Sequence, residues 1–105
     1  MFKVANRVYV LPEYEAEFEA RFKARAGKIE LQAGFVNMEV LKPLGNSAPW
    51  VVLTTWENQD AFRNWVQSDD FKEAHSNPMP QEAFGEGGGI EQHEVVITAG
   101  ERCEA

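Results

Sequence analysis

Apolar and polar residues alternate strictly at the start of the chain. One row consists of Phe2, Val4, Asn6, Val8 and Val10. A period of two predicts a β-strand over residues 2–11 with one face against a core. Asn6 interrupts that apolar row, where a carboxamide buried without partners would cost on the order of 1–3 kcal/mol. Two interpretations stay open: an amide satisfied by backbone groups of a neighbouring element, or one that donates into a pocket between sheet and helices.

Apolar spacings of three and four residues then predict an amphipathic helix over residues 12–34. Pro12 suits a first helical turn, and acidic residues follow it where the helix dipole favours them. Gly34 can take the left-handed conformation that ends a helix. The apolar stripe is Tyr14, Phe18, Phe22, Ala26 and Ile29.

Two runs rich in β-branched and aromatic residues, 35–42 and 50–56, predict a hairpin with a turn over residues 43–49. Asn58 is a good N-cap for a second helix. Ser68 is expected to restart or kink that helix. The apolar face before it is Ala61, Phe62, Trp65 and Val66, and the face after it is Phe71, Ala74 and His75.

Residues 76–89 are rich in Pro and Gly and predict a loop, and residues 90–99 predict a last strand. The order β-α-β-β-α-β is the ferredoxin-like α+β arrangement, an antiparallel sheet with both helices on one face. We expect one domain over residues 1–99 and a frayed tail over 100–105. Apolar residues on both faces of the sheet predict sheet-to-sheet packing in a homodimer; they are Val36, Met38, Val40, Val51, Leu53, Val95 and Ile97.

Composition narrows the class of protein. The chain has 105 residues, 44% hydrophobic and 26% charged, which is typical of a soluble globular domain. A net charge of −7 argues against a nucleic-acid partner, and no apolar run is long enough to span a membrane. The single cysteine, Cys103, excludes an internal disulfide and a Cys-based zinc site. With no secretory pattern at the N-terminus, we expect a cytoplasmic protein.

Few residues suggest chemistry. Catalytic triads, paired carboxylates and phosphate-binding loops are absent from the sequence. Taken alone, Trp65 is most simply a core residue, His75 a helix-end capping group and His93 an exposed strand residue. One histidine is nevertheless enough for heme, whose in-plane ligands come from the porphyrin. The basic cluster Arg21, Lys23, Arg25 and Lys28 is either a solvated helix face or an anchor for a small anionic ligand.

Several stretches resemble a known family. They are VANRV at 4–8, RFKAR at 21–25, Gly34-Phe35 and WENQDAFRNWVQSDDFKEAH at 56–75. The motif W-x4-A-F-x2-W at 56–65 is typical of the antibiotic biosynthesis monooxygenase superfamily. Asn6, Trp65 and His75 together narrow the resemblance to its IsdG-type heme-degrading monooxygenases. The resemblance covers residues 2–98 and implies a dimeric α+β barrel.

The resemblance also implies an activity. Heme would be both cofactor and substrate, and O2 with an external electron donor would open the porphyrin ring and release iron. His75 would be the proximal iron ligand, Asn6 the distal amide that hydrogen-bonds the oxygen, and Trp65 the group that presses the ring out of plane. The other contacts that it implies are Phe22 in the pocket wall and Arg21 or Arg25 beside a propionate.

Two other functions remain open. A cofactor-independent monooxygenase of the same fold would act on an aromatic or quinol substrate, with Asn6 and Trp65 lining its pocket and His75 a general base or incidental. A non-catalytic heme-binding protein would hold heme without degrading it. The heme-degrading enzyme, a homodimer served by a reductase, is the leading hypothesis. The loop over residues 76–89 is expected to control access.

Overall fold

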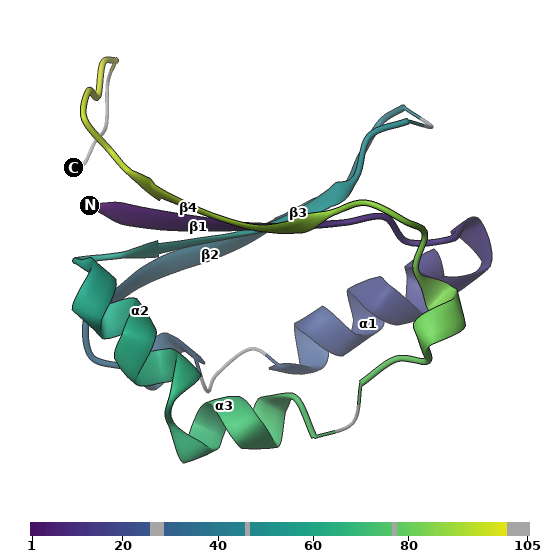
Figure 1. The fold of residues 1–105 in the computed structure, drawn as a ribbon, viewed down its shortest axis with the longest axis horizontal. Helices are drawn as coiled ribbons and strands as arrows, with labels where there is room; N and C mark the ends of the chain where they lie inside the picture. Colours follow the sequence, from purple (N-terminus) through teal and green to yellow (C-terminus); the bar gives the residue numbers. More distant parts are fainter. Residues whose placement is uncertain (26–28, 46, 77, 101–105) are drawn as a thin grey trace.

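Four antiparallel strands form one sheet in the order β2-β3-β1-β4, and the helices lie together on one of its faces (Figure 1). The structure, a computed structural model, describes residues 1–25, 29–45, 47–76 and 78–100, with Arg25 described by its backbone alone. Three 3-10 turns accompany the regular elements: η1 (Pro12–Tyr14), η2 (Ile29–Leu31) and η3 (Gln81–Ala83). The strands and helices are β1 (Phe2–Val8), α1 (Glu15–Arg25), β2 (Phe35–Leu41), β3 (Trp50–Trp56), α2 (Gln59–Val66), α3 (Asp69–Ala74) and β4 (Gly89–Glu94). This element order confirms the ferredoxin-like prediction.

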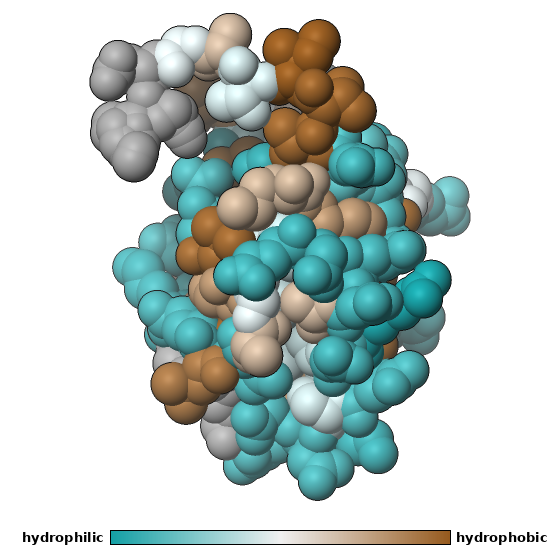
Figure 2. All heavy atoms as spheres, turned by 90° about the vertical axis from the view of Figure 1, so that its left-hand side faces the viewer, coloured by the Kyte–Doolittle hydropathy of each residue, from teal (hydrophilic) through white to brown (hydrophobic). Residues whose placement is uncertain are grey.

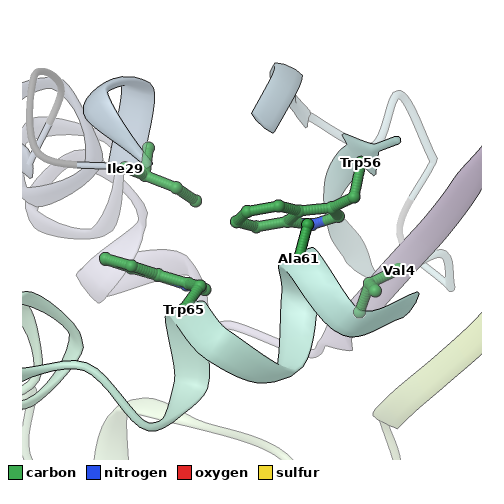
Figure 3. Close-up of a cluster of buried hydrophobic side chains, with 5 residues drawn as sticks. All are labelled: Val4, Ile29, Trp56, Ala61 and Trp65. Atoms are coloured by element: carbon green, nitrogen blue, oxygen red, sulfur yellow. The ribbon is translucent and has the colours of Figure 1, made fainter. Parts of the chain in front are cut away.

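The central strand β3 carries the core. Every second residue of β3, from Trp50 to Trp56, is buried beneath the helices. At one end Trp50 packs with Phe18 of α1, their ring centroids 5.1 Å apart. At the other end Trp56, wholly buried, packs with residues of α2 (Figure 3). The space between these two clusters is where a cavity can form.

The first strand is shorter than predicted. Pairing of β1 stops at Val8 with β3 and at Arg7 with β4, before the expected end at residue 11. Beyond it the chain makes one bridge, Val10 to Phe84, and the N–H of Gly85 donates to the carbonyl of Tyr9 at 2.7 Å. The alternation continues past the strand because the apolar side chain of Val10 still packs on the core.

The prediction that the first helix runs to Gly34 is wrong. The structure describes helix α1 as Glu15–Arg25, and residues 29–31, well before Gly34, form the 3-10 turn η2. The Ala26 of the predicted stripe lies outside the described residues. Gly34 does take the left-handed conformation, with φ 81°, but it leads into β2. A Cβ at Gly34 would stand 2.5 Å from the Cβ of Ala61, so the close approach of α2 also requires glycine.

The N-cap predicted at Asn58 and the helix restart predicted at Ser68 are both confirmed. The side chain of Asn58 accepts from the N–H of Ala61 at the start of α2. Ser68 ends the first segment and caps the next, α3, by accepting from the N–H of Phe71. The restart expected at Ser68 therefore produces two short helices with an angle between them (Figure 1).

The last strand is also shorter than predicted, because β4 ends at Glu94. Its neighbour β1 begins at Phe2, which pairs with Glu94, so later residues have no strand beside them in the described part of the chain. The N–H of Val95 makes the last contact, to the carbonyl of Met1. Val96 and Ile97 are then 83% and 82% exposed, and Figure 2 shows apolar atoms gathered at this projecting end.

The helices cover one face of the sheet and leave the opposite face open (Figure 1). Met38 and Val40 of β2 pack on the helix side, as parts of the core clusters. Val51 and Leu53 pair with Arg7 and Ala5 on the opposite face, where they are half-buried. The sheet-to-sheet dimer stays a prediction. Among the described residues, no helix has the length and apolar character needed to cross a membrane.

Candidate functional site

A cavity of about 450 Å³ lies between the sheet and the helices. Its wall is mostly apolar, and the polar side chains that reach it come from β1, β3, β4 and the end of α3. The lining residues are Val4, Asn6, Phe22, Ile29, Met38, Val52, Thr54, Phe62, Trp65, Val66, Phe71, Ala74, His75, Ile90 and Gln92. Asn6, Phe22, Trp65 and His75, all singled out from the sequence, thus line one space.

Asn6 lies on the sheet floor of this cavity. It pairs with Val52 of β3 on one side and Ile90 of β4 on the other, so apolar side chains flank it. Its half-buried amide has no hydrogen-bond partner among the described residues. Nothing in the described part of the chain supports the interpretation in which backbone groups satisfy this amide. A polar group kept at such a cost is free to bond a ligand in the cavity.

Trp65 combines the two roles that the sequence left open. It is 6% exposed and belongs to the core cluster around Trp56, Ala61 and Ile29 (Figure 3). It also lines the cavity, and the ring of Phe71 meets it edge-on with centroids 5.4 Å apart. A rigid ring anchored in the core in this way presents a fixed surface to anything that enters.

The hydroxyl of Ser68 joins the helix that carries Trp65 to the helix that leads to His75. It donates to the carbonyl oxygen of Trp65 at 2.7 Å and accepts from the N–H of Phe71 at 3.1 Å. A second tie comes from the residue after η2, where the amide of Gln32 donates to the carboxylate of Asp70 at 3.0 Å. These bonds fix the angle between α2 and α3, and with it the position of the histidine.

His75 is the C-cap of α3 and lies at the open side of the cavity. Its Nδ1 is 2.8 Å from the carbonyl oxygen of Phe71. A carbonyl can only accept, so Nδ1–H donates and the neutral imidazole keeps its lone pair on Nε2. The two rings are also in contact, with centroids 4.1 Å apart. A histidine oriented through one nitrogen is arranged to bind a metal through the other.

The structure describes the side chains of only two residues of the basic cluster, Arg21 and Lys23. The guanidinium of Arg21 pairs with Glu17 at 2.8 Å, and Lys23 pairs with Glu19 at 3.3 Å, both one turn apart on α1. These pairs favour the solvated-face interpretation for Arg21 and Lys23. The side chain of Arg25 and all of Lys28 lie outside the described residues, as does Cys103.

His93, the second histidine, does not join the site. It pairs with Lys3 in the row of residues that faces away from the helices, and it is exposed, as predicted. Among the described residues, no three His, Cys, Asp or Glu side chains gather where they could hold a metal ion. The imidazole of His75 is the only one in the cavity wall.

Sequence reasoning missed two polar residues of the cavity, Thr54 and Gln92. Thr54 is buried, and Gln92 accepts from Gln59 at 3.3 Å, across the gap between β4 and α2. Both are in register with Val4 on the helix side of the sheet. The alternation of β3 could have found Thr54, since it falls in the same row as Val52 and Trp56.

Comparison with known proteins finds a matching family, related sequences and similar structures. The family model described as antibiotic biosynthesis monooxygenase matches residues 1–77. A heme oxygenase (staphylobilin-producing) from Staphylococcus haemolyticus is 39% identical over 79 residues, which cover 73% of this chain and 75% of that protein.

Solved structures of the heme-degrader MhuD are also similar. The Mycobacterium tuberculosis protein with two hemes bound in its active site has a TM-score of 0.77 and 27% identity, covering 95% of this chain and 100% of that one. A mutant of MhuD with two manganese protoporphyrins per active site has a TM-score of 0.81 and 26% identity, covering 96% and 100%. The chain belongs to the antibiotic biosynthesis monooxygenase family.

Proposed function

We propose that this protein is a heme-degrading monooxygenase, which binds heme as cofactor and substrate and opens the porphyrin with O2 and external electrons. One observation carries the proposal: Asn6, Trp65 and His75 line a single, mostly apolar cavity. The names of the relatives support the same substrate, since one is a heme oxygenase and others are heme degraders with porphyrin bound.

The residues of the cavity fit heme on their own chemistry. A porphyrin is a flat apolar ring, which suits a wall built mainly from aromatic and aliphatic side chains. Its iron would take one ligand from the protein. The Nε2 of His75 could supply it, because the Nδ1–H is hydrogen-bonded to the carbonyl oxygen of Phe71 and the lone pair lies on Nε2. When bound, heme supplies the redox chemistry that activates oxygen.

The other residues act on what the cavity holds. The amide of Asn6, which has no partner among the described residues, would donate a hydrogen bond from the sheet floor to the oxygen substrate and so orient it. Trp65, held edge-on by Phe71 and packed in the core, would present a rigid surface against the porphyrin. Phe22 closes the wall on the side of α1. Together these side chains exclude water and bring one edge of the ring near the oxygen.

Further features of the proposal concern the surroundings of the site. One of the two arginines of α1, Arg21 or Arg25, binds a propionate of the heme. Two subunits pack through the open faces of their sheets, on which Val51 and Leu53 lie, and each subunit carries one heme site. A reductase in the cytoplasm supplies the electrons, and the loop over residues 76–89 controls entry.

A hemin titration tests the function directly. The purified protein should develop a Soret band that saturates with hemin, and ascorbate with O2 should then bleach it. His75→Ala should lose the band or shift it to that of weakly held hemin. His93→Ala is the matched control, because that histidine is exposed and faces away from the helices, and it should behave as wild type.

The outcomes separate the three functions. Normal binding and bleaching in His75→Ala would contradict the assignment of the ligand. A stable Soret band that does not bleach under reductant would indicate a heme-binding protein without catalysis. Absence of any hemin spectrum, together with oxidation of a quinol, would indicate the cofactor-independent monooxygenase.

A further inference from the structure

Thr54, in the middle of β3, holds a hydrogen-bond donor that nothing in the described structure uses. Its side chain is 8% exposed and lines the cavity. The hydroxyl oxygen accepts from the indole N–H of Trp56 at 3.0 Å. Its own hydrogen has no acceptor among the described residues. An unused donor this deeply buried is uncommon, because it forfeits a bond that water would have supplied.

The position of Thr54 relates it to Asn6. In the pairing of β1 with β3, Asn6 stands opposite Val52 while Val4 stands opposite Thr54. Asn6 and Thr54 are therefore diagonal neighbours on the same face of adjacent strands, a relation that places side chains about 7–8 Å apart. Both line the cavity, so its sheet floor offers two unpartnered donors from neighbouring strands.

Trp56 determines how the hydroxyl of Thr54 is presented. The indole N–H occupies one lone pair of the hydroxyl oxygen, and the Trp56 ring is wholly buried and cannot move aside. The threonine O–H must then point away from the indole. A β-branched side chain has few rotamers in which to do so. The donor is thus pre-oriented before any ligand arrives.

We propose that Thr54 is a second hydrogen-bond donor to the small acceptor that binds on the heme face away from His75, acting together with Asn6. The inference rests on the proposed heme function. Trp56 is a positioning residue, because it acts through Thr54. Two fixed donors, one an amide and one a hydroxyl, hold dioxygen or a diatomic analogue in one orientation toward the ring edge.

Cyanide and carbon monoxide are suitable probes, since each binds loaded heme and accepts a hydrogen bond without turnover. Thr54→Val removes the donor and keeps the shape of the side chain. It should weaken cyanide binding to the ferric hemin complex about 3- to 10-fold, the usual effect of one lost hydrogen bond. The C–O stretch of the ferrous carbonyl should rise, because less positive charge then faces the ligand. Thr54→Ser keeps the hydroxyl and should restore both values.

The valine variant also leaves the Trp56 indole without its acceptor, so a second variant separates the two effects. Thr54→Val combined with Trp56→Phe removes the orphaned N–H as well. If the hydroxyl acts on the ligand, the double variant keeps the weakened cyanide binding and the raised C–O stretch. If Thr54 only holds Trp56 in place, the double variant returns toward wild type and the inference is overturned. Should the double variant not fold, the near-UV circular dichroism of Thr54→Val decides. An unchanged aromatic signal together with the raised C–O stretch assigns the effect to the hydroxyl, and a changed signal assigns it to a displaced Trp56 and overturns the inference.

Failure of the inference differs from failure of the proposed function. Unchanged cyanide affinity and C–O stretch in Thr54→Val, with a Soret band that still depends on His75, would overturn the role of Thr54 alone. Absence of hemin binding by the wild-type protein would overturn both.

Discussion

The carbonyl oxygen of Phe71 accepts two hydrogen bonds from His75, one from Nδ1 at 2.8 Å and one from the backbone N–H at 3.1 Å. The helix end and the imidazole are therefore fixed by the same atom. Because the two rings also lie 4.1 Å apart, the side chain of Phe71 restricts the imidazole from a second direction.

This double restraint predicts the effect of Phe71→Leu. The carbonyl remains, but the ring contacts with His75 and Trp65 are lost. Each aromatic pair contributes about 0.5–1.5 kcal/mol, so hemin affinity should fall roughly 3- to 10-fold, while the Soret position stays that of histidine ligation. Leu31→Ala is the control, since Leu31 is exposed and lies outside the cavity wall. A hemin titration of both variants measures the difference, and equal affinities would contradict the restraint.

Replacing Asn6 with an apolar residue should raise the stability of the protein and slow the degradation of heme. Its amide has no partner among the described residues, so Asn6→Leu removes a desolvation cost and should raise the free energy of unfolding by about 1 kcal/mol. Bleaching of bound hemin should slow roughly 100-fold, as when a donor to developing negative charge is removed. Urea unfolding and single-turnover bleaching measure the two effects. Asn37→Leu, at an exposed position of β2, should change neither, and a destabilised Asn6→Leu would contradict the account.

Replacing Ser68 should lower the thermal stability more than replacing Ser76, which makes a similar local hydrogen bond. Ser68→Ala removes both the cap of α3 and the bond to Trp65, and should cost about 1–2 kcal/mol of unfolding free energy. For a domain of this size the midpoint of thermal unfolding should fall by roughly 4–8 °C per kcal/mol. Ser76→Ala also loses a bond to a carbonyl, that of Glu73, but at an exposed site. It should lower the midpoint by less than half as much.

Gly34 should not tolerate a methyl group. Gly34→Ala places a Cβ 2.5 Å from that of Ala61, at a residue with φ 81°. We expect a loss of about 1–3 kcal/mol, since both overpacking and backbone strain oppose the change. Gly45→Ala is the control, because no atom lies within 4 Å of the added Cβ and its φ is ordinary. Equal thermal midpoints for the two variants would contradict the close approach of α2.

Local patterns were enough to predict the elements. The strand predicted over residues 50–56 from its β-branched and aromatic residues is confirmed residue for residue as β3. The N-cap predicted at Asn58 and the restart predicted at Ser68 are confirmed as well. These features depend on periodicity and on side-chain bonds within three residues, both of which the sequence contains. The errors fall at ends: β1 and β4 stop early, and α1 does not run to Gly34. Strand ends depend on the length of the neighbouring strand, which no local pattern encodes.

The sequence by itself also determined which residues were unusual. Asn6 in an apolar row and His75 at a helix end could be identified, and the resemblance joined them to Trp65. Only the tertiary structure decided that the Asn6 amide lacks a partner among the described residues, that the Nδ1 of His75 is hydrogen-bonded and that Thr54 lines the same cavity. Hydrogen bonds and cavities arise where segments distant in the chain meet. Their presence is therefore fixed by the packing of β1, β3 and the two short helices, and not by any one of them.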